Sequence, residues 1–105
     1  MEYPRQPLIQ PRLDVLGIER NFGITAGIAN VVVLQRNPRR SGATFVNISD
    51  TRVFLCKGDI AVLNSGIPLN ANGGSYEINF TNLYQGILSV ITSAANKTLC
   101  VTEQE

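Results

Sequence analysis

The chain of 105 residues contains no histidine and no tryptophan, and it has only two cysteines. Without histidine, serine–histidine and cysteine–histidine catalytic pairs cannot form, and most zinc and iron sites lose a frequent ligand. Two thiols cannot complete a four-thiolate metal site. The sequence therefore predicts a protein that holds neither a metal nor another cofactor, and it argues against an enzyme.

Charged residues are also scarce, at 16% of the chain, and the net charge is only +1. Proteins that bind nucleic acid or anionic membranes generally carry a large excess of lysine and arginine. Neither nucleic acid nor a membrane is therefore an expected partner. The signs are unevenly spread, because residues 1–52 contain seven arginines and four acids, whereas residues 53–105 contain two lysines and four acids. This polarity favours docking between copies of the chain or with partners.

Long apolar runs are missing too, and none approaches the length of a transmembrane helix. Met1–Arg12 carries three prolines and two arginines where a signal peptide needs an apolar core. We therefore expect synthesis in the cytoplasm without export. In that compartment Cys56 and Cys100 are expected to be reduced, buried thiols, with a disulfide between them as the alternative.

Carboxylates are the remaining candidates for acid–base catalysis. Asp50 follows Ser49 and Asp59 follows Gly58, both in turn sequences where an aspartate side chain commonly bonds nearby backbone. Glu77 falls on the polar face of a predicted strand. The sequence therefore predicts structural roles for these acids and no catalytic residue.

From Asn21 onward, short β-branched and aromatic runs alternate with turn residues. Residues 70–74 form the strongest turn signal, because asparagine and glycine tolerate positive φ. No helical crossover segment separates the runs, so the strands are expected to pair antiparallel. The predicted strands are 22–26, 30–35, 43–48, 52–57, 60–63, 76–80, 87–92 and 98–102, and Ser65–Leu69 is a further short run of this kind.

These strands predict an all-β protein: a small antiparallel β-sandwich or jelly-roll-like barrel of seven to eight short strands with an extended N-terminal arm. We place the arm at residues 1–19 and the β-sandwich domain at residues 20–105. Residues 43–48 and 52–57 are expected to form a hairpin across Ser49-Asp50-Thr51, and the last two strands are expected to pair through residues 93–97.

The N-terminal arm differs in composition from the rest of the chain. Its three prolines, at positions 4, 7 and 11, exclude a regular helix and favour extended geometry. Its apolar side chains are too many for a solvated tail, so they should bury against the domain's own flank or against a neighbour. The residues of the arm predicted to bind a partner are Tyr3, Leu8, Ile9, Arg12 and Leu13.

Arg36, Arg39 and Arg40 surround Pro38 and form the one concentrated charge feature. Three guanidinium groups on a loop could clamp carboxylates of a partner subunit, which arginine does better than lysine. The alternative is an ordinary solvated connection between strands. Tyr84 is a further candidate, either as an interface anchor or as a plug for the domain's own edge.

From Asn37 onward the order of turns and strands resembles that of small virion proteins of tailed phages. The shared pattern is an arginine-rich start, a strand, an Asn-x-Ser turn, a second strand, a Gly-Ile-x-Leu corner, a Gly-Gly turn and two final strands. The arm is not covered by this resemblance. The segments that carry it are Asn37–Leu55, Ser65–Leu69, Gly73–Ser75 and Leu99–Glu103.

The resemblance implies a virion structural protein, first of all a capsid decoration (cement) protein that binds and stabilises the viral head shell. It would be made in the host cytoplasm, act in the virion, and contact the major capsid protein or other virion proteins. A homo-oligomer is expected, with a trimer favoured. The alternatives are a neck, tail or fibre-base component of a phage and, in a different class, a carbohydrate-binding β-sandwich module.

Overall fold

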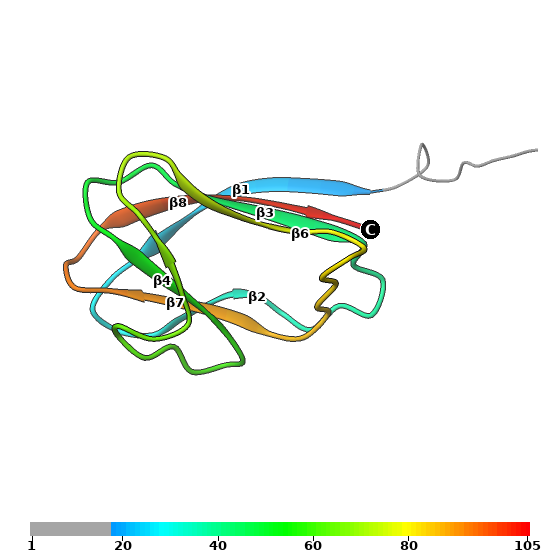
Figure 1. The fold of residues 1–105 in the computed structure, drawn as a ribbon, viewed down its shortest axis with the longest axis horizontal. Helices are drawn as coiled ribbons and strands as arrows, with labels where there is room; N and C mark the ends of the chain where they lie inside the picture. The colour runs from blue at the N-terminus through cyan, green and yellow to red at the C-terminus, as the bar shows by residue number, and fades with distance from the viewer. Residues whose placement is uncertain (1–17) are drawn as a thin grey trace, which may run out of the picture.

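The computed structural model describes residues 18–105, and all of their regular structure is β-strand (Figure 1). Eight strands and no helix are found in this range, which confirms the predicted all-β class. The same residues accordingly include no helix that is long and apolar enough to cross a membrane. The strands are β1 (Glu19–Ala26), β2 (Val31–Leu34), β3 (Gly42–Asn47), β4 (Val53–Lys57), β5 (Ile67–Leu69), β6 (Gly74–Ile78), β7 (Leu88–Thr92) and β8 (Lys97–Gln104).

The strands form two four-stranded sheets, with the orders β1-β8-β3-β6 and β2-β7-β4-β5. All neighbouring strands pair antiparallel. Figure 1 shows the two sheets as separate layers facing each other. The sandwich form of the prediction is therefore correct, and each sheet ends in two edge strands.

The core lies between the two sheets, and β8 illustrates how the sequence builds it. Leu99, Val101 and Glu103 are buried, whereas Cys100 and Gln104 between and after them are exposed. This period of two places alternate side chains on the inner face. Each fully buried leucine or valine contributes about 1.5–3 kcal/mol through removal of apolar surface from water. The core residues are Ala26, Val33, Leu34, Ala43, Phe45, Val53, Leu55, Leu69, Ile78, Leu88, Val90, Leu99 and Val101.

The predicted hairpin between residues 43–48 and 52–57 is wrong, because β3 and β4 belong to different sheets. The connection is held by the buried side chain of Asn47, whose amide nitrogen donates to the carbonyl oxygens of Thr51 at 2.8 Å and Leu69 at 2.9 Å. Its amide oxygen accepts from the backbone nitrogen of Ser49 at 2.9 Å. These bonds turn the chain from one sheet into the other, and such an arch has the same local residue types as a hairpin.

The predicted pairing of the last two strands is wrong for the same reason. β7 pairs with β2 and β4, whereas β8 pairs with β1 and β3. Residues 93–96 therefore cross between the sheets and do not close a hairpin. Asn96 has a φ of 61°, a value that is typical of a turn residue. The predicted turn at residues 93–97 is therefore correct, whereas the predicted pairing of the two strands that flank it is wrong.

The strand predicted for residues 76–80 ends at Ile78. Asn79 begins a turn in which its amide oxygen accepts from the backbone nitrogen of Thr81 at 2.9 Å, and its own backbone nitrogen donates to the amide oxygen of Asn82 at 2.7 Å. Phe80 is consequently held at the tip of this turn with 88% of its surface exposed. The strand ends two residues before the period-two sequence pattern does. The side chain of Asn79 forms hydrogen bonds with nearby backbone groups, and these bonds compete with strand pairing.

The loop between β4 and β5 covers the outer face of the second sheet, and the strand predicted for residues 60–63 is wrong because these residues belong to this loop. Phe54 and Cys56 point away from the inter-sheet core but are buried, and Ala61 of the loop is buried as well. The loop returns to β5 through Gly66, which has a φ of 80°. A Cβ atom at this position would lie 2.6 Å from the carbonyl oxygen of Leu55. Glycine therefore allows the loop backbone to approach β4.

Substitution of Gly66 by alanine tests this close approach. Gly58 in the same loop also has positive φ, 115°, but nothing lies within 4 Å of the place where its Cβ would be. Gly58→Ala is expected to cost about 1–3 kcal/mol of unfolding free energy through backbone strain alone. Gly66→Ala should cost a further ~1–3 kcal/mol through overpacking. Urea unfolding measures both losses, and equal losses would contradict the close approach.

The cysteines are both free in the structure, and they differ in exposure. Cys56 is buried under the β4–β5 loop, where its thiol donates to the carbonyl oxygen of Ser65 at 3.5 Å. Cys100 is exposed on the outer face of β8, so the prediction that both thiols are buried is wrong for this residue. The period-two alternation of β8 explains the difference, since Cys100 lies between two inward-facing residues.

A thiol-reactive dye should therefore distinguish the two residues. The native protein is expected to react at Cys100 within the mixing time of a standard assay, and Cys56 should react only after unfolding in denaturant, because a buried thiol cannot reach the reagent. The Cys100→Ser variant serves as the control that assigns the fast reaction. Two fast thiols, or none, in the native protein would contradict this arrangement.

Candidate functional site: a groove between two edge strands

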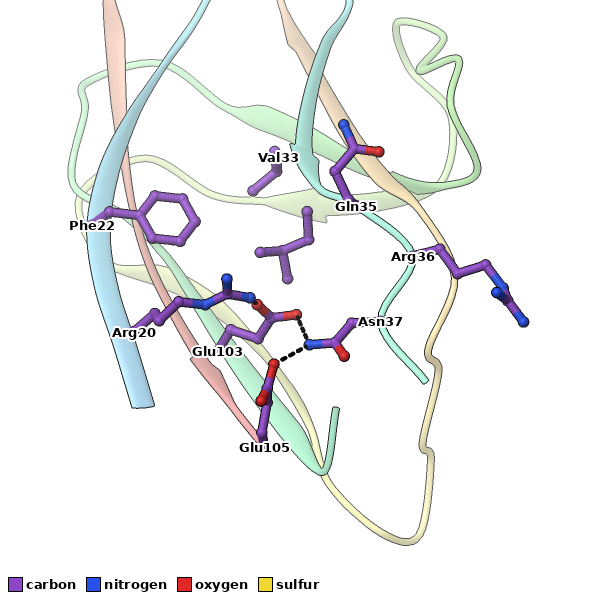
Figure 2. Close-up of a pocket in the computed structure, with 9 residues that line it drawn as sticks. Arg20, Phe22, Val33, Gln35, Arg36, Asn37, Glu103 and Glu105 are labelled. Atoms are coloured by element: carbon purple, nitrogen blue, oxygen red, sulfur yellow. Dashed lines mark hydrogen bonds and ion pairs between the residues drawn. The ribbon is translucent and has the colours of Figure 1, made fainter. Parts of the chain in front are cut away.

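A groove of about 440 Å³ lies between β1 of one sheet and β2 of the other. Its apolar lining comes from Phe22 on β1 and from Val33 and Leu34 on β2 (Figure 2). β1 and β2 are edge strands, because β1 pairs only with β8 and β2 only with β7. The groove is thus the place where one open side of the sandwich is not closed by a further strand.

The groove exists because β1 is longer than the strand that faces it. β1 has eight residues and β2 has four. Along the inner face of β1, Ala26 is fully buried and Ile24 is partly buried, whereas Phe22 is 38% exposed. Ile18, just before the strand, is 56% exposed. The inner face of β1 therefore loses its cover progressively toward its N-terminal end.

A buried arginine connects strands and loops at the end of the sandwich beside this groove. Arg40 is 1% exposed, and its Nε donates to Oε2 of Glu103 at 2.8 Å. Its Nη1 donates to the carbonyl oxygens of Tyr84 at 3.0 Å and Gly86 at 2.9 Å, and its Nη2 donates to that of Gln35 at 2.6 Å. The guanidinium group thereby joins the end of β8 to the loops after β2 and β6. Every one of its nitrogens has a partner, which a buried charge requires.

The carboxylate of Glu103 lies at the centre of the polar side of the groove. Its Oε1 forms an ion pair with the guanidinium of Arg20 on β1, and its Oε2 accepts from the amide nitrogen of Asn37 at 3.2 Å. The same amide nitrogen donates to Glu105 at 2.9 Å. Figure 2 shows these four side chains converging on the lower part of the groove. One buried carboxylate therefore connects both sheets at this end.

The electrostatics of the cluster follow from its burial. Desolvation lowers the pKa of Arg40 from its ordinary value, the nearby Tyr84 raises it, and the positive charge of Arg20 lowers it further. The arginine stays protonated at physiological pH despite this shift. The pair with Glu103 is thus a charge-assisted contact inside the protein, and it is not a site that exchanges protons.

The prediction that Arg36, Arg39 and Arg40 form one exposed cluster is wrong for Arg40. A guanidinium bound to Glu103 inside the fold cannot clamp the carboxylate of a partner. Arg39 is exposed, with its Nε 3.9 Å from Glu105. Arg36 contributes to the rim of the groove, and its side chain points away from the interior (Figure 2). The structure therefore leaves two of the three predicted arginines on the surface.

The partner of Arg40 was missed because the two residues are 63 positions apart. A signal was nevertheless present in β8, where Glu103 occupies the inward position that follows Leu99 and Val101 in the period-two pattern. A carboxylate at an inward position needs a buried cation, since an unpaired buried charge is strongly unfavourable. That reasoning predicts a buried arginine or lysine without identifying which one.

The other residues singled out in the sequence have structural roles or lie elsewhere. Tyr84 makes contacts within its own domain. Its hydroxyl donates to the carbonyl oxygen of Ile87 at 3.1 Å, and Lys57 Nζ lies 5.3 Å from the centre of its ring. Asp50 accepts from Lys97 at 2.7 Å and from Thr51 at 2.9 Å, and these bonds lower the pKa of its carboxyl group. The residues predicted to bind partners in the arm, Tyr3, Leu8, Ile9, Arg12 and Leu13, lie outside the described residues.

Within residues 18–105, no group of three or more acidic or cysteine side chains is placed to hold a metal ion. No protein-family model, no curated protein and no solved structure matches the chain. The groove beside β1, with its apolar wall and the exposed Arg36 at its rim, is thus the feature of the described fold on which a function can be argued.

Arg39 and Arg40 form a matched pair for testing the buried cluster. Arg40→Met should lower the unfolding free energy by about 3–5 kcal/mol, because it leaves Glu103 buried with less compensating charge. Arg39→Met should change it by at most about 0.5 kcal/mol, since the side chain is 78% exposed. Thermal or urea unfolding of both variants measures the difference.

A second variant separates lost charge pairing from lost packing. In Arg40→Met combined with Glu103→Leu no charge of this pair remains buried, so much of the loss in Arg40→Met should be recovered. Equal, small effects of Arg39→Met and Arg40→Met would contradict the role given to the buried pair.

Proposed function

We propose that this chain is a virion structural protein, and specifically a capsid decoration (cement) protein that binds and stabilises the head shell of a tailed phage. In this role it is made in the host cytoplasm, acts in the virion and works without catalysis. Its partners are the major capsid protein or other virion proteins, and it acts as a homo-oligomer, with a trimer as the favoured form.

The observation that carries the proposal is the open groove next to the point where the N-terminal arm enters β1. Ile18 precedes β1 at this edge, and Phe22 presents part of its ring to the groove. A free sheet edge with exposed apolar side chains is a surface suited to binding another polypeptide. The resemblance from Asn37 onward adds the class of assembly, since it points to virion proteins.

Contact alone is sufficient for such a function because a capsid repeats each binding site many times. A weak contact at one site is multiplied by symmetry, and an oligomer that engages several sites at once gains further through effective concentration. A small sandwich held together by Arg40 and Glu103 provides a stable body for this purpose. The exposed Arg36 and Arg39 can add charge-assisted contacts to carboxylates on the shell.

The number of copies in a particle tests the proposal. Particles are purified from host cells that carry the gene, and the chain is quantified with isotope-labelled peptides. On the order of hundreds of copies per particle are expected for a decoration protein, because a shell repeats its lattice site many times. About a dozen copies or fewer would instead assign the chain to the neck, tail or fibre base. Absence from the particles would overturn a virion function altogether.

Phe80 favours a carbohydrate-binding module as the second candidate. It is the most exposed large apolar side chain of the described residues, and the turn around Asn79 fixes its position. Sugar sites in β-sandwiches commonly use exposed aromatic rings as stacking platforms. A glycan array with the full-length protein separates the candidates, with Phe80→Ala as the control. Binding that disappears in Phe80→Ala would favour the sugar-binding role, and an array without hits would remove it.

A further inference from the structure

We propose that the groove between β1 and β2 receives the N-terminal arm of a second copy of this chain, which adds to the free edge of β1 as an extra strand. This inference rests on the homo-oligomer part of the proposed function and deepens it, because it names the surfaces that join the copies; it does not depend on where the assembly resides. It rests on the free edge, on the uncovered apolar face beside it and on the chemistry of the arm.

β1 offers a free edge of eight residues beside the groove. β1 pairs with β8 over all eight of its residues, and its other side has no partner strand in the described part of the chain. The sequence Glu19–Ala26 contains no proline that would prevent a further strand from pairing. An unpaired edge offers a row of N–H and C=O groups that bind an extended peptide through backbone hydrogen bonds.

The side chains beside this edge supply the apolar part of the site. Phe22 and Val33 face each other across the groove from different sheets (Figure 2). Ile18 extends the exposed apolar surface toward the start of β1. Alternate apolar residues of an added strand would pack on these side chains, which gives the backbone contact its specificity.

The arm has the properties that such an occupant requires. Seventeen of the nineteen residues assigned to the arm precede Ile18, and an extended chain rises about 3.3 Å per residue, so this part of the arm can reach a neighbouring copy. Leu13 and Val15 alternate with Arg12 and Asp14, which is the pattern of a strand with one apolar face. A strand added to an edge uses backbone groups on one side only, so the prolines nearer the N-terminus are tolerated.

The arm and the groove each carry charges of both signs. The groove rim carries Arg36 and Glu105, and the arm carries Asp14 and Arg12. Pairs of opposite sign at the rim help to select the register of an added strand and contribute little to affinity.

A second copy is favoured over the chain's own arm because the arm of another copy can reach the edge of β1 in either direction and at any register. The chain's own arm must first reverse its direction close to Ile18, whose carbonyl oxygen already accepts from the backbone nitrogen of Glu105 at 2.8 Å. A short connecting loop also fixes the register of the strand that it adds.

Such an exchange connects the arm of one copy to the groove of the next. A connection of this head-to-tail kind closes into a ring when the rotation between copies allows it, and a reciprocal exchange between two copies gives a dimer. A ring of three would correspond to the trimer favoured above. The groove therefore assigns the arm a role in building the oligomer.

Cross-linking between two full-length variants tests the exchange. Both carry Cys100→Ser, so that the exposed native thiol does not interfere. One carries a cysteine in the arm, at Leu8, Leu13 or Val15 in separate preparations, and the other carries Phe22→Cys in the groove. The two are mixed and treated with a short bis-maleimide. The matched control replaces the groove variant by Ser75→Cys, which lies on β6 at the opposite edge of the same sheet.

The expected result is a covalent heterodimer with Phe22→Cys for at least one arm position, and none above background with Ser75→Cys. A single chain that carries both the arm cysteine and Phe22→Cys is treated in parallel at high dilution. A link within that chain, without links between chains in the mixture, would overturn the proposal because the arm would occupy its own groove. Equal linking to Phe22→Cys and Ser75→Cys, or no linking at all, would overturn it too.

The mass of the assembly in solution provides an independent readout. Light scattering of the full-length protein should give a multiple of the 11.4 kDa chain. Leu13→Asp in the arm and Phe22→Asp in the groove should each shift the mass to that of one chain, while Phe80→Asp, at an exposed apolar residue outside the groove, should leave it unchanged. Circular dichroism checks that each variant keeps its β-sheet signal. A single-chain mass for the unmodified protein at concentrations up to about millimolar would contradict the exchange.

Discussion

The guanidinium of Arg40 and the carboxylate of Glu103 lie buried at one end of the sandwich, and the arrangement of that end depends on their contact at 2.8 Å. Two charges removed from water are stable only when their hydrogen-bonding groups are matched. The carbonyl oxygens of Tyr84, Gly86 and Gln35 supply the remaining partners of the arginine. The loops after β2 and β6 and the end of β8 are thereby held in fixed relation, and the wall of the groove is part of that rigid unit.

The rigid end contrasts with the open edge beside it. The ion pair between Arg20 and Glu103 ties the beginning of β1 to the buried cluster, yet Phe22 on the same face remains partly uncovered. A site built on strands whose positions are fixed loses little conformational entropy when a peptide binds. A buried cluster with fixed positions next to an unpaired strand edge therefore suits peptide binding better than a mobile loop would. β1 is accordingly both a structural element and the expected contact surface.

Much of the fold could be predicted from the sequence, because strands and turns are encoded locally. The alternation of Leu99, Val101 and Glu103 with exposed neighbours identifies β8, and the turn residues mark where most strands end. The connections after β3 and β7 were mistaken for hairpins, because a hairpin and an arch between sheets use the same turn residues. The groove could not be predicted either, since it results from the difference in length between β1 and β2, two strands of different sheets.

Amide hydrogen exchange along β1 as a function of protein concentration tests the central claim most directly. If the edge of β1 is a docking site for the arm of another copy, the amides of residues 19–25 that face away from β8 should exchange rapidly at high dilution and become protected as the concentration rises. Amides of β6, at the opposite edge of the same sheet, should not change. Exchange in β1 that is identical at all concentrations, or protection that rises equally in β6, would contradict the account.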